Sequence, residues 1–369
     1  KHMKLENIKK DGNYYSAWKA LNQTDSIDLL KRGEMFAPKD IQVDLEAYCP
    51  HSCEFCSYRN VNWQSHGMDF AEPDRPVPEE SGLPKEIAMR LPREMHEAGI
   101  PSIELTGGGE PMVYPHIREF LDELAKYPIE LAIVTNGASL NEQIQDRLKN
   151  LKWIRFSADA ITPETHSKVH RVQPSVFNVV IRHIKEVVDR QYEDCRVGIS
   201  FVITEQNFHE IEDAARFYKD LGVSNIRYTF TYDPEGEGLM TAEETRQAER
   251  SLNRARLLQD ESFKVFGTMR RLEFYSQPNT DFHFCGYQFF TWAIGYEGQV
   301  YPCCIMKYHP GFEMGNLHTQ SLKEIVHSEE RRKFVDGFDV HDCKACWLRD
   351  KNQFIEYLLA DNPQHINFV

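Results

Sequence analysis

The 369-residue sequence lacks any apolar run of about 18 residues, so no segment of it is expected to cross a membrane as a helix. It shows no signal peptide at its beginning. It also lacks a basic excess, because 43 lysines and arginines face 57 aspartates and glutamates, for a net charge of −14. A nucleic-acid-binding surface neutralises phosphates with basic side chains. We therefore expect neither a nucleic-acid partner nor a membrane partner.

The nine cysteines are not arranged as a disulfide framework. Cys195 stands alone at the start of an apolar segment and is expected to be a small buried hydrophobe. The other eight fall into three groups: Cys49, Cys53 and Cys56; Cys285, Cys303 and Cys304; and Cys343 and Cys346. Grouped cysteines in a large chain without an export signal are typical of metal ligands in a reducing compartment. We therefore expect a cytoplasmic metalloprotein.

The first cysteine group directly follows an alternating apolar segment, residues 41–45, which predicts a strand. Cys49, Cys53 and Cys56 are separated by three residues and then by two. A four-iron cluster that the protein ligates fully takes one thiolate for each iron, so three thiolates leave one iron open. An open iron favours chemistry over scaffolding. Zinc remains an alternative, because three cysteines and an open position also suit that metal.

A glycine-rich segment, Thr106 to Pro111, follows the apolar run 103–105. Glycines let the backbone approach a ligand without a Cβ in the way, and Pro111 closes the turn. A strand that runs into glycines is also compatible with a plain tight turn. The spacing of some fifty residues from the cysteine triplet makes the segment more specific.

Together these two motifs resemble those of the radical S-adenosylmethionine (SAM) superfamily. The triplet, with Phe55 before its third cysteine, is similar to the cluster motif of that family. The residues Gly108, Gly109, Glu110 and Pro111 are similar to its "GGE" motif, whose backbone holds the SAM amino group. The resemblance implies a [4Fe–4S] cluster on the three cysteines, with SAM on the open iron. An electron from a flavodoxin or ferredoxin then cleaves SAM to a 5′-deoxyadenosyl radical, which takes a hydrogen atom from the substrate.

Helical and strand patterns alternate through the first two thirds of the chain. Periodicity predicts strands at 41–45, 102–105, 129–134, 153–156, 196–203 and 226–230, and helices at 84–98, 116–127, 142–151, 176–190, 211–221 and 241–258. This order implies an α/β fold with a parallel sheet and right-handed crossovers. The family resemblance implies a partial (β/α)6 barrel, whose active site lies at the C-terminal ends of the strands. Residues 60–82 have no periodicity and predict a long loop.

Further SAM contacts are expected beyond the fourth strand. Ser157 and Asp159 follow that strand, and the resemblance gives Ser157 a hydrogen bond to the SAM ribose. The segment 165–171 resembles the family segment whose arginine pairs with the SAM carboxylate, and Arg171 suits that role because a guanidinium meets a carboxylate with two parallel hydrogen bonds. The non-functional alternatives are that Ser157 caps the next segment and that Arg171 is a surface charge. The segment 135–137 suits a turn equally well.

The last third of the chain predicts a second cluster. Cys285 and Cys303, with Gly298 five positions before the latter, and then Cys343 and Cys346 supply four thiolates. The pattern resembles auxiliary-cluster domains called SPASM and twitch, and matches the shorter twitch form, which holds one auxiliary [4Fe–4S] cluster. Cys303 and Cys304 are not expected to bind one cluster together, because neighbouring residues in an extended chain point opposite ways. Cys303 is preferred because it keeps the spacing from Gly298. A zinc site built from the same four thiolates is the alternative.

Four regions are expected along the chain. They are an N-terminal covering segment (1–38, with 1–3 typical of a tag remnant), the radical SAM barrel (39–235), a connecting helical region (236–280) and the auxiliary-cluster domain (281–369).

Three functions are compatible with these motifs. The leading hypothesis is hydrogen abstraction from a small polar metabolite such as a sugar, aminocyclitol or nucleoside, because only 48 residues precede the triplet, which is short for a recognition module. The auxiliary cluster would then accept the electron in an oxidation. The alternatives are modification of a ribosomal peptide or protein side chain, and a non-enzymatic iron–sulfur or zinc module. An oxidation needs a base near the substrate, for which the candidates are Glu104, Arg227, Tyr228 and Asp233.

Overall fold

The computed structural model describes residues 15–56, 58, 81–230, 240–267, 281–343 and 346–360. The tag-like residues 1–3, most of the 60–82 loop, Asp233 and the expected boundary at 235/236 lie outside these ranges.

One ten-stranded sheet organises the molecule, in the order β10-β9-β8-β1-β2-β3-β4-β5-β6-β7. The seven strands of its parallel core are β1 (Asp40–Asp44), β2 (Ser102–Thr106), β3 (Glu130–Thr135), β4 (Leu151–Ser157), β5 (Arg196–Ile203), β6 (Asn225–Phe230) and β7 (Lys264–Phe266). Their order in the sheet equals their order in the chain, so each crossover reaches the adjacent strand. All their C-terminal ends therefore meet at one rim, as the sequence predicted.

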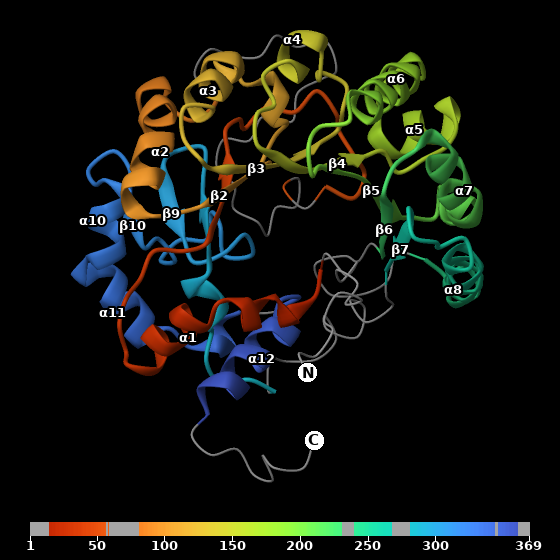
Figure 1. Cartoon of the computed structure of the whole chain (residues 1–369). Coiled ribbons are helices and arrows are strands. Elements are labelled where there is room, and N and C mark those ends of the chain that lie inside the picture. The colour runs from red at the N-terminus through yellow and green to blue at the C-terminus, as the bar shows by residue number, and fades with distance from the viewer. Residues whose placement is uncertain are drawn as a thin grey trace, which may run out of the picture.

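Helices cover the outer face of this curved sheet (Figure 1). They are α2 (Lys85–Ala98), α3 (Ile117–Leu124), α4 (Glu142–Gln145), α5 (Pro163–His170), α6 (Ser175–Arg190), α7 (Ile211–Leu221) and α8 (Ala242–Arg256). Each longer helix buries one apolar stripe, as α7 does with Ile211, Ala214, Ala215 and Tyr218. Alternate strand residues such as Ile103 and Leu105 meet these stripes in the main core. Cys195 packs against the same core, and burial raises the pKa of its thiol to about 12.

Several predicted elements differ from the structure, and the helix α5 was not expected at all. The helix expected at 142–151 ends at Gln145, because Asn150 takes a left-handed conformation (φ 54°) and Leu151 already pairs with Leu131 as the first residue of β4. Strand pairing therefore overrides local helix preference. The short strand β7 was not expected, and its parallel pairing with β6 adds a seventh strand to the predicted six.

The C-terminal third continues the barrel sheet. The strand β8 (Thr291–Ile294) pairs parallel to β1, and β9 (Gln299–Tyr301) and β10 (Gly315–Asn316) follow antiparallel. Three further helices, α10 (Leu322–His327), α11 (Glu329–Gly337) and α12 (Arg349–Leu359), complete this region. The N-terminal helix α1 (Thr24–Lys31) contacts α12, and both lie on the open side of the strand arc in Figure 1.

Short 3₁₀ turns link these elements: η1 (Ala17–Asn22), η3 (Pro111–Val113), η4 (Phe208–Glu210), η5 (Tyr287–Phe289) and η6 (Val340–Asp342). Within the described ranges, no helix has the length and apolar character needed to cross a membrane.

Candidate metal and cofactor site

The two N-terminal motifs lie side by side because β1 and β2 are parallel neighbours. The Gly109 N–H donates to the Glu46 carbonyl at 2.8 Å, and the Glu110 N–H donates to the Tyr48 carbonyl at 2.9 Å. A Cβ on Gly109 would lie 2.1 Å from the Tyr48 carbonyl oxygen, so only glycine permits this approach. The glycine motif is therefore fastened to the segment that leads into Cys49.

Glu110 joins the ends of β2 and β3. Its buried carboxylate accepts hydrogen bonds from the Thr135 hydroxyl (2.6 Å), the Asn136 N–H (2.7 Å) and the Met112 N–H (3.0 Å). Burial raises the pKa of Glu110 to about 7, and these hydrogen bonds oppose the shift. The Asn136 amide Nδ2, held in this way, lies 3.9 Å from the Cys49 sulfur. The segment 135–137, which the sequence left undecided between turn and site, thus reaches the cysteine loop.

Cys49, Cys53 and Cys56 converge at the same rim. Burial raises the pKa of the Cys53 thiol, and the neighbouring Cys49 and Cys56 raise it further. Buried thiols that disfavour each other's ionisation become stable thiolates when a cation binds them. The donor set therefore fits a metal cluster with three protein ligands.

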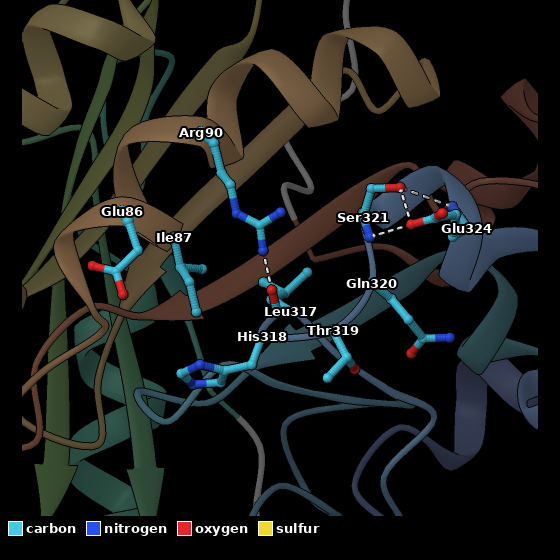
Figure 2. A pocket seen from close by; sticks show the side chains of 9 residues that line it. All are labelled: Glu86, Ile87, Arg90, Leu317, His318, Thr319, Gln320, Ser321 and Glu324. Carbon is cyan, nitrogen blue, oxygen red and sulfur yellow. Dashed lines mark hydrogen bonds between the residues drawn. The ribbon is translucent and has the colours of Figure 1, made fainter.

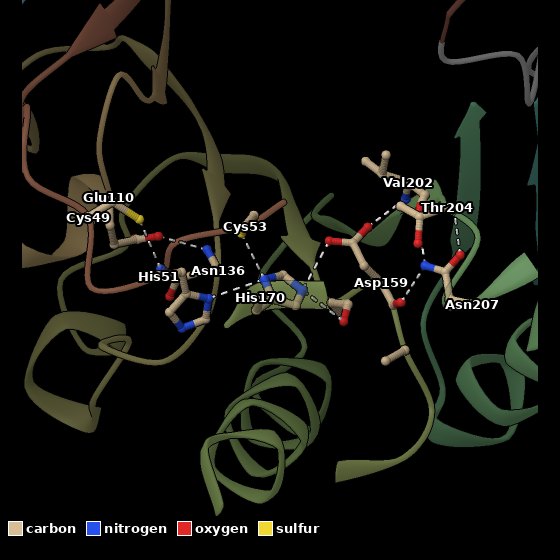
Figure 3. Close-up of polar contacts among 12 residues, drawn as sticks. Cys49, His51, Cys53, Glu110, Asn136, Asp159, His170, Val202, Thr204 and Asn207 are labelled. Atoms are coloured by element: carbon tan, nitrogen blue, oxygen red, sulfur yellow. Dashed lines mark hydrogen bonds and ion pairs between the residues drawn. The ribbon is translucent and has the colours of Figure 1, made fainter. Parts of the chain in front are cut away.

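A buried polar network lies behind Cys53, as Figure 3 shows. The Cys53 sulfur is 3.1 Å from His170 Nδ1, and His170 Nε2 is 3.1 Å from an Asp159 carboxylate oxygen. The other Asp159 oxygen accepts from the Val202 N–H at 2.5 Å. Both His170 and Asp159 are 0% exposed. His170 Nε2 also lies 3.2 Å from the Ala158 carbonyl oxygen, within hydrogen-bond distance.

Two more buried histidines surround His170. The His51 Nδ1 lies 3.2 Å from His170 Nδ1, and the His166 ring stacks on the His170 ring with centroids 4.3 Å apart. Within the described part of the chain, both His166 nitrogens are without a hydrogen-bond partner. Burial and the nearby His170 lower the pKa of His166 to about 3. His51, Cys53 and His170 lie close enough together to hold one metal ion in the absence of a cluster.

The other expected SAM contacts occupy varied places. Pro111 begins η3 at the rim, the Phe55 ring meets His170 edge-on at 6.2 Å, and Ser157 ends β4 in a partly buried position. Arg171 is exposed and has a left-handed backbone (φ 52°) directly beyond the end of α5. Burial raises the pKa of Glu54, and the charge of Arg171 opposes this rise. His170, one residue earlier, is the side chain of this segment that reaches the cysteine loop.

The second cysteine set lines one apolar cavity. Phe282, Val340 and Leu348 line this cavity. All four expected ligands line it as well: Cys285, Cys303, Cys343 and Cys346. Burial raises the pKa of Cys343, and Cys285 and Cys346 raise it further. The four thiols therefore face one another in a dry space, and this arrangement fits a fully ligated cluster.

Cys304 is absent from the residues that line this cavity, although it packs against them. Its thiol acts to raise the pKa of Tyr58, Tyr287 and Lys351, and also that of Cys303. Of the two neighbouring cysteines, Cys303 is the one that lines the cavity.

The expected bases divide between the inner face of the barrel and the core. Glu104 accepts from the Gln42 amide at 3.0 Å and lies 3.9 Å from the Arg155 guanidinium. Arg227 lies over the Tyr15 ring at 4.6 Å. Tyr228 points away, because its hydroxyl donates to the Ile211 carbonyl at 2.6 Å inside the helix-facing core. Asp233 lies outside the described residues.

The sequence also missed a buried ion pair between the two cysteine regions. Lys307 Nζ, three residues after Cys304, lies 2.6 Å from the Asp44 carboxylate, and these side chains are 1% and 0% exposed. The Tyr308 hydroxyl donates to the same carboxylate oxygen at 2.7 Å. No local pattern links residues 263 positions apart, so sequence reasoning had no signal for this contact.

A polar surface pocket of about 400 Å³ lies elsewhere, between α2 and the segment that leads into α10 (Figure 2). Arg90 crosses it to the Leu317 carbonyl, and His318 lines its edge. None of the cysteines lines this pocket.

The parallel barrel with three converging thiols at its rim, and four more in a C-terminal cavity, defines an iron–sulfur protein. Residues 47–218 match the model of the radical SAM superfamily, and residues 285–347 match that of the SPASM iron–sulfur cluster-binding domain. The chain belongs to the radical SAM superfamily and is an enzyme of the SPASM-containing type. Its cofactors are [4Fe–4S] clusters and SAM, as the two family matches imply, and these matches favour the cluster assignments over the zinc alternatives and the non-enzymatic module.

Relatives of known name match at low identity. The chain is 26% identical over 268 residues to the antilisterial bacteriocin subtilosin biosynthesis protein AlbA of Bacillus subtilis, covering 71% of this chain and 57% of AlbA. It is 28% identical over 200 residues to the GTP 3′,8-cyclase of Aquifex aeolicus, covering 50% of this chain and 54% of the cyclase. The chain thus spans a little over half the length of these relatives.

Solved structures confirm the fold. SuiB of Streptococcus suis, solved with SAM, superposes with a TM-score of 0.61 at 17% identity, covering 90% of this chain and 75% of SuiB. A structure of SuiB with its precursor peptide SuiA matches with a TM-score of 0.60.

Proposed function

We propose that this enzyme cleaves SAM reductively at a cluster on Cys49, Cys53 and Cys56 and oxidises a small polar substrate bound inside the barrel. The observation that carries the proposal is the charged inner face of the sheet. The Glu104 and Arg155 side chains keep 13% and 14% exposure although β2 and β4 are central strands. We propose that this remaining exposed surface receives polar groups of the substrate.

The chain's own residues divide the work between binding and orientation. Gly109 and Glu110 hold the SAM-binding segment against the cysteine loop through backbone hydrogen bonds. Glu104 and Arg155 bind polar groups of the substrate, and Glu104 is the carboxylate placed to accept a proton during an oxidation. The bound cofactors supply the electron and the hydrogen-abstracting radical. A flavodoxin or ferredoxin is the expected electron donor.

The auxiliary cluster belongs to the same proposal. Cys285, Cys303, Cys343 and Cys346 would saturate its irons, so it would exchange electrons rather than bind substrate. The domain limits 39–235 for the barrel and 281–369 for the auxiliary part belong to the proposal as well. The family matches over 47–218 and 285–347 support them.

A peptide substrate is the second candidate, and the relatives favour it. AlbA takes part in bacteriocin biosynthesis and SuiB binds a precursor peptide, as their names and titles state. Two assays separate the candidates: deuterium transfer into 5′-deoxyadenosine from a panel of labelled metabolites, and the same transfer from synthetic peptides encoded near the gene. Transfer from a peptide alone would replace the leading proposal by this second one.

Cysteine replacement tests the ligand assignment. Replacing Cys49, Cys53 and Cys56 by Ala should abolish SAM cleavage and leave about four iron atoms per chain at the auxiliary site. The control is Cys195→Ala, which should keep both cleavage and the full iron content. An unchanged iron content in the triple variant would contradict the proposed ligands.

Replacement of Glu104 tests the substrate site. Glu104→Gln should still cleave SAM but should lower product formation by about 10²- to 10⁴-fold, the usual range for a lost general base. Glu130→Gln, on the exposed first residue of β3, is the matched control. Equal product formation in both variants would remove Glu104 from the proposal.

A further inference from the structure

Two arginines on the inner face of the barrel sheet meet at one aromatic ring. The Tyr228 hydroxyl lies in the helix-facing core, so its neighbour Arg227 on β6 takes the opposite, inner face. The Arg227 guanidinium lies 4.6 Å from the centroid of the Tyr15 ring. The Arg155 guanidinium, on β4, lies 5.8 Å from the same centroid. One ring therefore brings two guanidinium groups together.

Aromatic packing holds Tyr15 in this place. Its ring meets the Phe266 ring of β7 edge-on, with centroids 4.9 Å apart. A cation over an aromatic ring is attracted to the face of that ring. Such packing fixes a guanidinium in direction without using the N–H groups with which it binds carboxylates or phosphates.

Arg155 makes only long polar contacts within the described residues. Its guanidinium is 3.9 Å from the Glu104 carboxylate and 3.5 Å from the Tyr15 hydroxyl. Charge-assisted N–H···O bonds measure about 2.7–2.9 Å. Glu104 in addition accepts from the Gln42 amide at 3.0 Å. The Arg155 side chain, which keeps 14% exposure, therefore retains donors for a ligand.

Two lysines add positive charge to this part of the barrel. Burial lowers the pKa of Lys351 on α12, and the charges of Lys19 and Arg227 lower it further, while Glu104 opposes them. These charges act on one another because they lie close together. The helix α12 lies on the open side of the strand arc in Figure 1.

The acidic side chains of the same region do not balance this charge. Burial, followed by repulsion from Glu104, raises the pKa of Asp40 to about 7, so this carboxyl carries only part of a negative charge at neutral pH. The basic members of the group are Lys19, Arg155, Arg227 and Lys351, and the acidic members are Asp40 and Glu104. In a chain with a net charge of −14, this inner face is thus locally positive.

The two arginines lie below the rim at which the cysteines converge. Arg155 precedes the end of β4 by two residues, and Arg227 precedes the end of β6 by three. With a rise of about 3.3 Å per residue, their backbones lie about 7 to 10 Å below the strand ends. A metabolite-sized molecule can span this distance between the arginines and the rim.

We propose that Arg155 and Arg227, held by the Tyr15 ring, bind a carboxylate or phosphate group of the substrate, which is therefore an anionic metabolite. This inference rests on the proposed function, whose substrate class it specifies. The anionic group lies deep in the barrel, and the carbon that loses its hydrogen atom stays near the rim. Arg155 and Arg227 fix the orientation of the substrate and take no part in proton transfer.

The experiment is a calorimetric titration of the anaerobic holoenzyme with inorganic phosphate and, separately, with succinate, both at constant ionic strength. One anion should bind per chain. Arg155→Gln and Arg227→Gln should each weaken its binding about 10- to 100-fold, because a charge-assisted hydrogen bond is lost. Tighter binding of phosphate or of succinate identifies which group the substrate carries. Binding of neither anion, or equal binding in the parent and both glutamine variants, overturns the proposal.

The matched control is Arg182→Gln, on the outer helix α6, where the arginine side chain is 63% exposed. It removes the same charge from the chain and should bind both anions as the parent does. Arg155→Lys and Arg227→Lys keep the charge but lose the planar fork, so they should retain part of the affinity. Each lysine variant takes the place of its glutamine variant if circular dichroism shows that the latter is unfolded.

A parallel measurement of SAM cleavage separates this inference from the proposed function. A parent enzyme that cleaves SAM but binds neither anion refutes the anion site alone. A parent enzyme that binds an anion through both arginines but cleaves no SAM refutes the proposed function and leaves the anion site standing.

Discussion

Replacing Lys307 by Met should lower the free energy of unfolding by about 3 kcal/mol, because it leaves the Asp44 carboxylate buried without its cation. Asp44 ends β1 and leads toward the first cysteine group, whereas Lys307 follows the second. The ion pair therefore joins the barrel to the auxiliary-cluster region. Burial by itself lowers the pKa of Lys307, but the Asp44 carboxylate, together with Tyr58, outweighs it and the net shift is upward, so Lys307 stays charged.

The magnitude follows from the geometry of the pair. Its nitrogen and oxygen are 2.6 Å apart and its side chains are 1% and 0% exposed. Loss of one partner from such a pair costs about 3–5 kcal/mol. Tyr308 still donates to the stranded carboxylate at 2.7 Å, so the lower end of that range applies. The double variant Asp44→Asn/Lys307→Met leaves no buried charge and should cost less than Lys307→Met alone.

Urea unfolding of the anaerobic holoprotein, followed by circular dichroism at pH 7, measures these differences from the transition midpoints and a shared slope. The control is Lys185→Met, which removes an exposed pair with Asp189 on α6, with side chains 51% and 59% exposed. Exposed pairs are worth about 0–1 kcal/mol. The reasoning fails if Lys307→Met costs no more than the control, or if the double variant costs as much as the sum of its single variants.

Three further predictions follow from the same structure. Cys303→Ala should lose about four iron atoms per chain while Cys304→Ala keeps them all, and iron analysis with the opposite result would exchange the two assignments. Gly109→Ala should abolish the SAM-induced change in the cluster signal, because its Cβ would lie 2.1 Å from the Tyr48 carbonyl oxygen. Gly337→Ala is the control, because the space around Gly337 is open. A normal SAM response in Gly109→Ala would contradict the close approach. Burial, reinforced by Glu104, raises the pKa of Asp40 to about 7. The folded state then binds the extra proton, so the contribution of Asp40 to stability falls as pH rises from about 4 to about 7. Asp40→Asn should therefore lose less unfolding free energy than the parent between pH 5 and pH 8, by about 2 to 3 kcal/mol, and identical slopes would disprove the assignment.

Much of the barrel could be predicted because its strands and helices carry strong local periodicity. The strand Arg196–Ile203 and the helix Ile211–Leu221 have the predicted bounds. The errors lie where pairing partners decide the outcome. The residues after Gln145 have helical spacing, but Leu151 is needed as the partner of Leu131. The strand β7 has only three residues, too few for a periodic pattern, and exists because β6 offers a free edge.

The candidate site also combines features that local sequence predicted with contacts that only the tertiary structure creates. Identity and spacing of the cysteines predicted metal binding, since ligand chemistry is a property of short segments. They did not single out His170, because a histidine one residue before the expected Arg171 gains meaning only when α5 ends there and packs on the cysteine loop. The choice of Cys303 over Cys304 rested on the spacing from Gly298, and of the two only Cys303 lines the apolar cavity.

The sequence by itself determined that this protein carries two sets of grouped cysteines, a glycine-rich segment directly after a strand and an alternating α/β chain, because each of these depends on neighbours within a few residues. Only the tertiary structure decided which side chains face the clusters and which charges are buried together. Asp44 with Lys307, and Cys53 with His170, meet through strand order and helix packing. Such contacts arise between segments more than a hundred residues apart, where no local pattern constrains the pairing.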